Sequence, residues 1–186
     1  MGLIAVARVR AVSLSCLILA TAWSVAYSVR AEQAITANLK QTLTQRLLMM
    51  HDVAAYKWIN QRPVEDLERE AQVLTATVER ATTFGLDRTF ATGVVRAQIS
   101  AAKHIQSRWF TVWAVEGGPA RAPDLTSELR PRISSQTEIL LQQLKTFSAV
   151  ELTEADRQTI TAVPPELRDD KMAWAIATAP MLQGIR

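Results

Sequence analysis

The chain has 186 residues, of which 48% are hydrophobic and 21% are charged, and its formal net charge is +3 at pH 7. This length is enough for one domain with a substantial hydrophobic core. Residues 1–31 contain Arg8, Arg10 and Arg30 but no acidic residue, so the rest of the chain has a formal net charge of zero. The basic balance therefore does not indicate nucleic-acid binding, and no run of basic residues interleaved with aromatic residues suggests it.

The N-terminus has the pattern of a secretory signal peptide. Basic residues precede an uncharged run at 11–29, and Val29-Arg30-Ala31 then offers a small-x-small cleavage site, with cleavage after Ala26 as the alternative. A run of this length could also remain as an uncleaved membrane anchor. We expect a signal peptide at 1–31 and a periplasmic or secreted domain after it. Cys16 is the only cysteine and would leave with the signal, so we expect no disulfide in the mature protein.

The first segment after the signal, residues 33–62, carries apolar residues at helical spacing and would form a helix about 45 Å long. These apolar residues are Leu39, Leu43, Leu47, Met50, Val53, Ala54 and Trp58. Pro63 suits the first position of a second helix. That helix is expected to run to about Phe84, where Gly85 provides a C-terminal stop.

Capping residues predict two further long helices. Asp87 suits the N-cap of a third helix, which runs to about Val115 and is broken by Gly117-Gly118-Pro119. Either Asp124 or Ser127 opens a fourth helix. A proline follows within its first turn, where a missing backbone N–H is tolerated.

The last part of the chain predicts short helices. Thr153-Glu154-Ala155-Asp156 resembles a capping box, and Pro164-Pro165 restarts a final helix that ends near Pro180. No alternation typical of strands is present. We therefore expect an all-α, single-domain bundle of about six helices at 32–186, with a core at about 33–150 and a helical tail at 151–186.

Two cations on the first helix share one face. Arg46 and Lys57 are 11 residues apart, a separation that returns to nearly the same azimuth after about three turns. Met50 and Val53 lie on that face as well, so both cations point toward the expected core. Buried cations are costly unless an anion meets them. The anion would be either one of the chain's own carboxylates or a small anionic ligand held inside the bundle.

Three charged residues, Asp66, Arg69 and Glu70, lie within one helical turn and crowd one face. Taken alone, such a cluster is most often an ordinary surface patch, and Arg46 alone could form an internal salt bridge with Glu70. Gln106 is a polar amide on the third helix, on the same face as Ala102 four residues earlier.

Together these residues resemble the all-helical chorismate mutases, in particular their secreted, periplasmic subclass. The family pattern is an Arg, a Lys 11 residues later, an acidic-x-x-Arg-Glu cluster, and a Gln or Glu well downstream. This chain matches it with Arg46, Lys57, Asp66, Arg69, Glu70 and Gln106. The resemblance covers roughly residues 33–150 and fades in the C-terminal tail.

The resemblance implies a role for each residue of the pattern. Arg46 would clamp a substrate carboxylate, because a guanidinium matches the carboxylate fork with two parallel hydrogen bonds. Lys57 and Gln106 would donate to the ether oxygen of the breaking bond. Glu70 would accept the ring hydroxyl. The backbone near Asp66 would assist it, and Arg69 would neutralise and orient the cluster.

The contacts expected for the substrate carboxylates differ from the family pattern at one position and are open at another. The family commonly has a hydroxyl residue where this chain has Ala102, which removes one substrate contact. A second carboxylate clamp is expected from a later helix of the same chain. Arg130 is our choice for it, Arg132 is the competitor, and an ordinary charged helix start is the alternative.

The implied reaction, chorismate to prephenate, is an intramolecular rearrangement that needs no cofactor. His51 and His104 have no metal-ligand spacing around them, so no metal site is expected. The resemblance also implies a homodimer, with no stable membrane association after signal cleavage and no nucleic-acid partner. Two other functions stay open from the residues alone: a non-catalytic binding module for an aromatic carboxylate, and a structural or sensory domain held at the membrane by residues 11–29.

Overall fold

The protein is an all-helical bundle. In the computed structural model the backbone is described for residues 9–183 and the side chains for 33–183. Six α-helices and no strand are found within residues 9–183, which confirms the predicted fold class. The helices are α1 (Val9–Ile59), α2 (Leu67–Thr83), α3 (Arg88–Glu116), α4 (Arg130–Phe147), α5 (Glu154–Thr161) and α6 (Lys171–Leu182). A π-helical turn (Leu125–Leu129) precedes α4, and a 3-10 turn (Pro165–Leu167) precedes α6.

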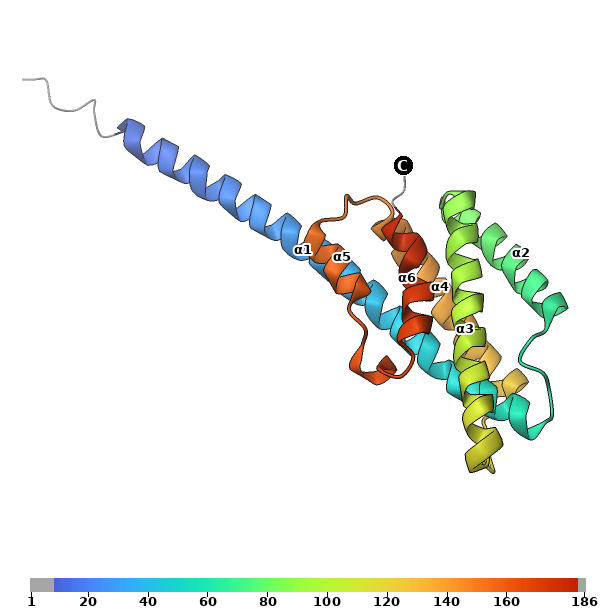
Figure 1. Ribbon diagram of the computed structural model, residues 1–186. Coiled ribbons are helices and arrows are strands. Elements are labelled where there is room, and N and C mark those ends of the chain that lie inside the picture. The colour runs from blue at the N-terminus through green and yellow to red at the C-terminus, as the bar shows by residue number, and fades with distance from the viewer. Residues whose placement is uncertain (1–8, 184–186) are drawn as a thin grey trace, which may run out of the picture.

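Helices α1 and α3 are the two on which the other helices pack. The C-terminal part of α1 contacts α3, α4 and α5, while α3 also contacts α2 and α6. The N-terminal part of α1 projects away from the bundle (Figure 1). Helix α2 lies on the outer side of α3. The space enclosed by α1, α2, α3 and α4 is where the residues singled out above meet.

The core follows the apolar face of α1. Leu39, Leu43 and Leu47 are almost completely buried, together with Leu141 and Leu144 of α4. At roughly 1.5–3 kcal/mol for each fully buried aliphatic side chain, this seam holds α1 and α4 together. It also fixes the part of α1 that carries Arg46 and Lys57.

The C-terminal tail is part of the same core. Trp174 of α6 is 1% exposed and donates its indole N–H to the carbonyl of Ile160 at 3.0 Å. Helix α6 packs along α3. The tail therefore supports α3 from the side opposite α2 (Figure 1).

Several predicted helix signals are confirmed. The side chain of Asp87 accepts a hydrogen bond from the backbone N–H of Phe90, and Asp124 rather than Ser127 caps the segment before α4. The capping box of Thr153 and Asp156 is formed. Gly85 follows α2 with a φ of +75°, a conformation that glycine adopts without strain.

The boundary between the first two helices was predicted wrongly. Helix α1 ends at Ile59 rather than at residue 62, and Pro63 lies in the connection rather than at the start of α2. Helix α2 begins at Leu67 because Asp66 is its N-cap, with a side-chain oxygen 3.0 Å from the backbone nitrogen of Arg69. A capping carboxylate satisfies a free N–H of the first turn, which a proline does not.

The final helix also differs from the prediction. After Pro164 the chain forms only the short 3-10 turn, and α6 starts at Lys171 and runs past Pro180 to Leu182. Pro180 is tolerated because it lies in the last turn, where one lost backbone hydrogen bond costs less than exposing its buried neighbours Ala177 and Met181.

Helix α1 is continuous across position 31 and begins well before residue 33, where the sequence analysis started its first helix. The expected signal peptide at 1–31 and the alternative anchor at 11–29 lie outside the residues whose side chains are described. Among the described residues, no helix combines the length and the apolar character needed to cross a membrane.

Candidate functional site

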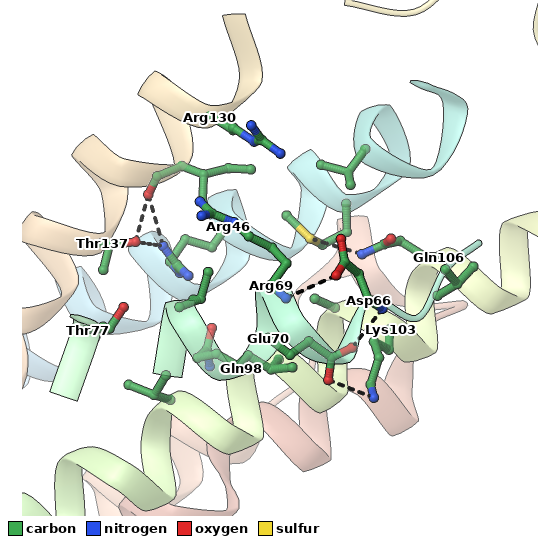
Figure 2. Close-up of a pocket in the computed structure, with 18 of the residues that line it drawn as sticks. Arg46, Asp66, Arg69, Glu70, Thr77, Gln98, Lys103, Gln106, Arg130 and Thr137 are labelled. Carbon is green, nitrogen blue, oxygen red and sulfur yellow. Dashed lines mark hydrogen bonds and ion pairs between the residues drawn. The ribbon is translucent and has the colours of Figure 1, made fainter. Parts of the chain in front are cut away.

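A cavity of about 570 Å³ lies between α1, α2, α3 and α4. Figure 2 shows polar side chains from these elements around it. All the residues expected to form the site line this cavity: Arg46, Lys57, Asp66, Arg69, Glu70, Gln106 and Arg130. Ala102 also lines it. Arg132 is exposed and is not among the lining residues, so the structure brings Arg130 to the cavity and leaves its competitor outside.

Arg46 is held by neutral acceptors. Its Nη1 donates to the hydroxyl of Thr137 at 2.6 Å and to the carbonyl of Ile133 at 3.2 Å. Its Nε is buried and has no hydrogen-bond partner among the residues that the structure describes. Burial lowers the pKa of Arg46 to about 10, which leaves the group cationic at neutral pH. Neither oxygen carries a full negative charge, and the internal salt bridge to Glu70 considered above is not formed.

Lys57 lies further along the same helix. Its ammonium donates to the carbonyl of Val64 at 2.6 Å, which ties the end of α1 to the connection before α2. Burial lowers the pKa of Lys57 below its ordinary value, while the negative charges of Asp66 and Glu70 partly oppose that shift. An ammonium has three donor hydrogens, so this bond leaves Lys57 able to donate to a ligand.

Hydrogen bonds fix the positions of the charged residues at the start of α2, Asp66, Arg69 and Glu70. Asp66 caps α2 through Arg69, and its own backbone N–H donates to Oε1 of Glu70 at 3.4 Å. Oε2 of Glu70 lies 2.9 Å from Nζ of Lys103. The guanidinium of Arg69 instead donates to the side chain of Gln72 at 3.3 Å. The cation that pairs with Glu70 is therefore Lys103 and not Arg69.

Gln106 is only 5% exposed. Its Nε2 has a weak contact with the sulfur of Met50 at 3.8 Å, and its Oε1 is buried without a partner. A buried amide oxygen without a partner costs free energy. Because Gln106 lines the cavity, a bound ligand could satisfy the amide group.

The sequence analysis missed several polar lining residues, among them Gln98, Lys103 and Thr137. A helical signal exists for each of these three. Gln98 and Lys103 are eight and three residues before Gln106, and Thr137 is seven residues after Arg130, so each shares a helix face with a residue already singled out. Polarity alone did not mark them, because similar residues occur along the exposed faces of both helices.

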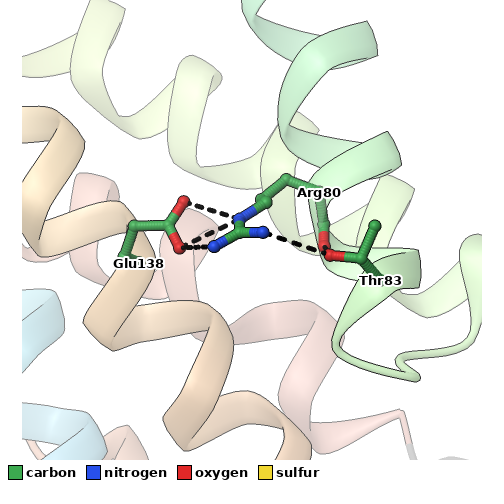
Figure 3. A network of polar contacts seen from close by, with 3 residues as sticks. All are labelled: Arg80, Thr83 and Glu138. Atoms are coloured by element: carbon green, nitrogen blue, oxygen red, sulfur yellow. Dashed lines mark hydrogen bonds and ion pairs between the residues drawn. The ribbon is translucent and has the colours of Figure 1, made fainter.

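A smaller cavity of about 360 Å³ adjoins the first between α2 and α4, and the two share Arg69, Arg130 and Thr137 among their lining residues. At its edge, Nε and Nη2 of Arg80 donate to the carboxylate of Glu138 at 2.8–3.0 Å (Figure 3). Arg80 also contacts Thr83 of its own helix. This exposed ion pair joins α2 to α4 across the outer side of the site.

The two histidines lie away from the cavity lining. His51 packs edge-on against Trp109 and Trp113, with ring centroids 4.5 and 5.6 Å apart, and His104 is exposed. Among the described residues no cluster of His, Cys, Asp and Glu side chains is arranged to hold a metal ion.

The arrangement is suited to a small, compact anion with more than one acidic group. Arg46 and Arg130 come from different helices, which lets them contact two separate carboxylates. Lys57 and Gln106 add two donors that are held apart from them, and Glu70 adds an acceptor. The apolar lining lowers the local dielectric and so strengthens each of these interactions.

Comparison with known proteins identifies the family. The sequence model of the family described as chorismate mutase type II matches residues 31–107. A protein named secreted chorismate mutase from Yersinia pestis is 30% identical over 128 residues, which are 69% of this chain and 68% of the relative. The chain belongs to the chorismate mutase type II family.

Further relatives of this family cover more of the chain. A monofunctional chorismate mutase from Enterobacter agglomerans is 30% identical over 152 residues, covering 78% of this chain and 74% of the relative. The crystal structure of a chorismate mutase from Burkholderia thailandensis superposes with a TM-score of 0.68 at 30% identity, covering 79% of this chain and 98% of that structure. The likeness therefore includes helices beyond the part that the family model matches.

Proposed function

We propose that this protein is a chorismate mutase, an isomerase that converts chorismate to prephenate. The observation that carries the proposal is Arg46, a partly buried cation whose hydrogen-bond partners among the described residues are neutral oxygens and which lines a cavity together with Lys57 and Gln106. A fold does not keep a cation in such a position without cost. A carboxylate of the substrate would offset that cost.

The proposed roles follow from the positions of the side chains. Arg46 and Arg130 bind the two carboxylates of chorismate. Glu70 accepts the hydrogen bond of the ring hydroxyl, with the backbone at Asp66 beside it. Arg69 lines both cavities and adds positive charge that would favour a dianion. Ala102 offers no hydroxyl, so the clamp on this side depends on the arginines.

The chemistry needs little beyond binding and fixed charges. As the ether C–O bond breaks and the new C–C bond forms within one molecule, negative charge develops on the ether oxygen. Lys57 and Gln106 would donate to that oxygen, and one preorganised donor of this kind can be worth roughly 10²–10³ in rate. Holding the flexible substrate in its compact reactive shape lowers the barrier further.

A binding module without turnover would use the same arginines. It would have no use for Lys57 and Gln106, the two additional donors that the proposal assigns to an ether oxygen rather than to a carboxylate. The presence of both around one cavity favours the enzyme over the binding module.

The location and assembly of the protein are also proposals. The names of the relatives from Yersinia pestis and from mycobacteria include the word secreted, which supports export of this protein by the signal at 1–31 into the periplasm or beyond. The domain would then be 32–186. In the homodimer that the family resemblance implies, each subunit would hold one complete site, because residues of a single chain supply every proposed contact.

The direct test is to follow chorismate loss and prephenate formation with purified protein, with and without a chelator. We expect turnover that the chelator does not change. Arg130→Ala should raise KM strongly, while Arg132→Ala, which changes an exposed arginine two residues away, is the matched control and should leave KM within about twofold. A folded protein without turnover would exclude the enzyme.

Mixing two variants with impaired substrate binding tests the single-chain site at a substrate concentration well below the KM of either. Arg46→Ala and Arg130→Ala proteins, unfolded and refolded together, should recover no activity, because each mixed dimer still lacks one clamp in every site. Recovery would mean that the site is shared between subunits.

A further inference from the structure

We propose that Lys103 is a positioning residue for the reaction: it holds the Glu70 carboxylate in place to receive the substrate hydroxyl and keeps that carboxylate away from Lys57. The inference rests on the proposed function. It concerns a residue outside the pattern by which the sequence resembled its family, on the helix α3 that also carries Gln106.

The two carboxylate oxygens of Glu70 have different partners. Oε2 lies 2.9 Å from the ammonium of Lys103, and Oε1 accepts the backbone N–H of Asp66 at 3.4 Å. Each carboxylate oxygen can accept more than one hydrogen bond. Both contacts therefore fix the plane of the carboxylate while acceptor capacity remains for a hydroxyl group in the cavity.

Lys103 has a second partner that serves as an internal comparison. Its ammonium also lies 2.9 Å from Oε1 of Glu65, in the connection between α1 and α2. The Glu65 side chain is 62% exposed and the Glu70 side chain is 22% exposed. Exposed ion pairs contribute little because water screens them. The contact with Glu70 is therefore the one expected to matter.

The reason that the protein needs a lysine here is the position of Lys57. Lys57 feels the negative charges of both Asp66 and Glu70, and its proposed task is to donate to the ether oxygen. Without Lys103, Lys57 is a cation of the same cavity that can pair with Glu70 instead. A direct pair between them would turn the ammonium away from the substrate and occupy the acceptor at the same time. Lys103 prevents this by pairing with Glu70 itself, in the ion pair drawn in Figure 2.

The test is a double-mutant cycle measured as kcat/KM for chorismate with the full chain. Lys103→Met keeps the length and apolar stem of the side chain but removes its charge, and we expect a loss of about tenfold. In a Glu70→Gln background the same change should have no further effect, since the group it positions has lost its charge. Lys103→Arg should retain most of the activity.

Glu65→Gln is the matched control. It removes the other, more exposed partner of Lys103, so kcat/KM should change by less than about twofold, and Lys103→Met should still cost about tenfold in that background. The thermal unfolding midpoint of each variant, measured alongside, identifies a loss that comes from unfolding. If Lys103 had only a structural role, Lys103→Met would shift the midpoint equally in the Glu70→Gln and Glu65→Gln backgrounds. The measurement would then not distinguish Glu70 from Glu65.

Two results would overturn the inference. One is an unchanged kcat/KM for Lys103→Met. The other is a loss of kcat/KM in the Lys103→Met, Glu70→Gln double variant that equals the product of the losses in the two single variants. That result would mean that the residues act independently. If the unaltered protein converts chorismate, either result leaves the proposed function intact. If the unaltered protein is folded but does not convert chorismate, the proposed function fails and this inference fails with it.

Discussion

Two partly buried arginines in this bundle have opposite surroundings. Arg108 of α3 makes a two-pronged contact with Asp170, with Nε 2.6 Å from Oδ1 and Nη2 2.8 Å from Oδ2. Its guanidinium also lies over the ring of Trp109, 4.4 Å from the centroid. Arg46 of α1 has only a hydroxyl and a carbonyl as partners, and its Nε has none.

The difference separates a charge that serves the fold from a charge that serves a ligand. Asp170 is 6% exposed and precedes α6, so its pair with Arg108 joins α6 to α3 and gives both oxygens of this buried carboxylate a cationic partner. Arg46 carries the same guanidinium group and is also partly buried, but no carboxylate among the described residues pairs with it. The bundle accepts the cost of this position, and a substrate carboxylate is the partner that would remove it.

The largest expected effect is on stability, and it has opposite signs at the two arginines. Arg108→Met should lower the free energy of unfolding by about 3–5 kcal/mol, because it leaves Asp170 buried without its cation. Arg46→Met should raise it by about 1–3 kcal/mol in ligand-free protein, because an apolar side chain of similar length replaces an uncompensated charge. Chemical denaturation of both variants at neutral pH measures the difference.

Arg130→Met is the control for this comparison, since it removes another cavity arginine from the start of a helix. A destabilisation by Arg46→Met as large as that by Arg108→Met would contradict the comparison. It would mean that the bonds to Thr137 and Ile133 are sufficient compensation for the buried charge.

The second effect is catalytic. Lys57→Ala should lower kcat by roughly 10²–10³, because the main partner of this ammonium is charge that develops only in the transition state. Arg46→Ala should raise KM strongly as well, because its partner carboxylate is present already in the bound substrate. A Lys57→Ala enzyme with a near-normal kcat would mean that Lys57 only ties Val64 to α1.

Much of the fold could be predicted because its signals are local. The apolar repeat of α1, the caps Asp87 and Asp124, and the stop at Gly85 each depend on a few neighbouring residues. Pro63 misled the prediction for the same reason. A proline suits a first helical position, but whether the helix starts there depends on the stronger cap at Asp66, three residues later.

The candidate site could be predicted only in part. Arg46 and Lys57 share a face by periodicity, and the resemblance to a family supplied Glu70, Gln106 and Arg130. The partners of these groups come from distant parts of the sequence: Thr137 is 91 residues from Arg46. Such contacts depend on how the helices pack against one another, and the periodicity of a single helix does not predict that packing. The pairing of Lys103 with Glu70 was missed for this reason.

A smaller effect is expected at Thr137. Its hydroxyl accepts from Arg46 at 2.6 Å and donates to the carbonyl of Ile133 at 2.8 Å. Thr137→Val keeps the shape and removes the acceptor, which should weaken substrate binding by about 1 kcal/mol, or roughly fivefold in KM, with little change in kcat. Thr137→Ser should restore most of the affinity. If the Thr137→Val and Thr137→Ser variants have the same KM, the hydroxyl does not position Arg46.

The smallest expected effect is on the pH dependence, and it tests which donor faces the ether oxygen. Gln106 donates through an amide that does not titrate. Lys57 is a cation whose pKa is lowered by burial. Its charge is therefore lost as pH rises through a value below the usual one for lysine, which is near ~10.4.

The profile of kcat/KM should accordingly be nearly flat between about pH 5 and 8, and it should decline at higher pH earlier than a solvated lysine would allow. Gln106→Glu changes this because a carboxyl group donates only while protonated. Its ordinary pKa is about 4.3 and burial raises it, and residue 106 is 5% exposed. The variant should therefore be most active in acid and lose activity as pH rises through that raised pKa. If the unaltered enzyme already loses most of its activity between about pH 5 and 8 while remaining folded, Gln106 is not the donor to the ether oxygen, and a titrating group has that role.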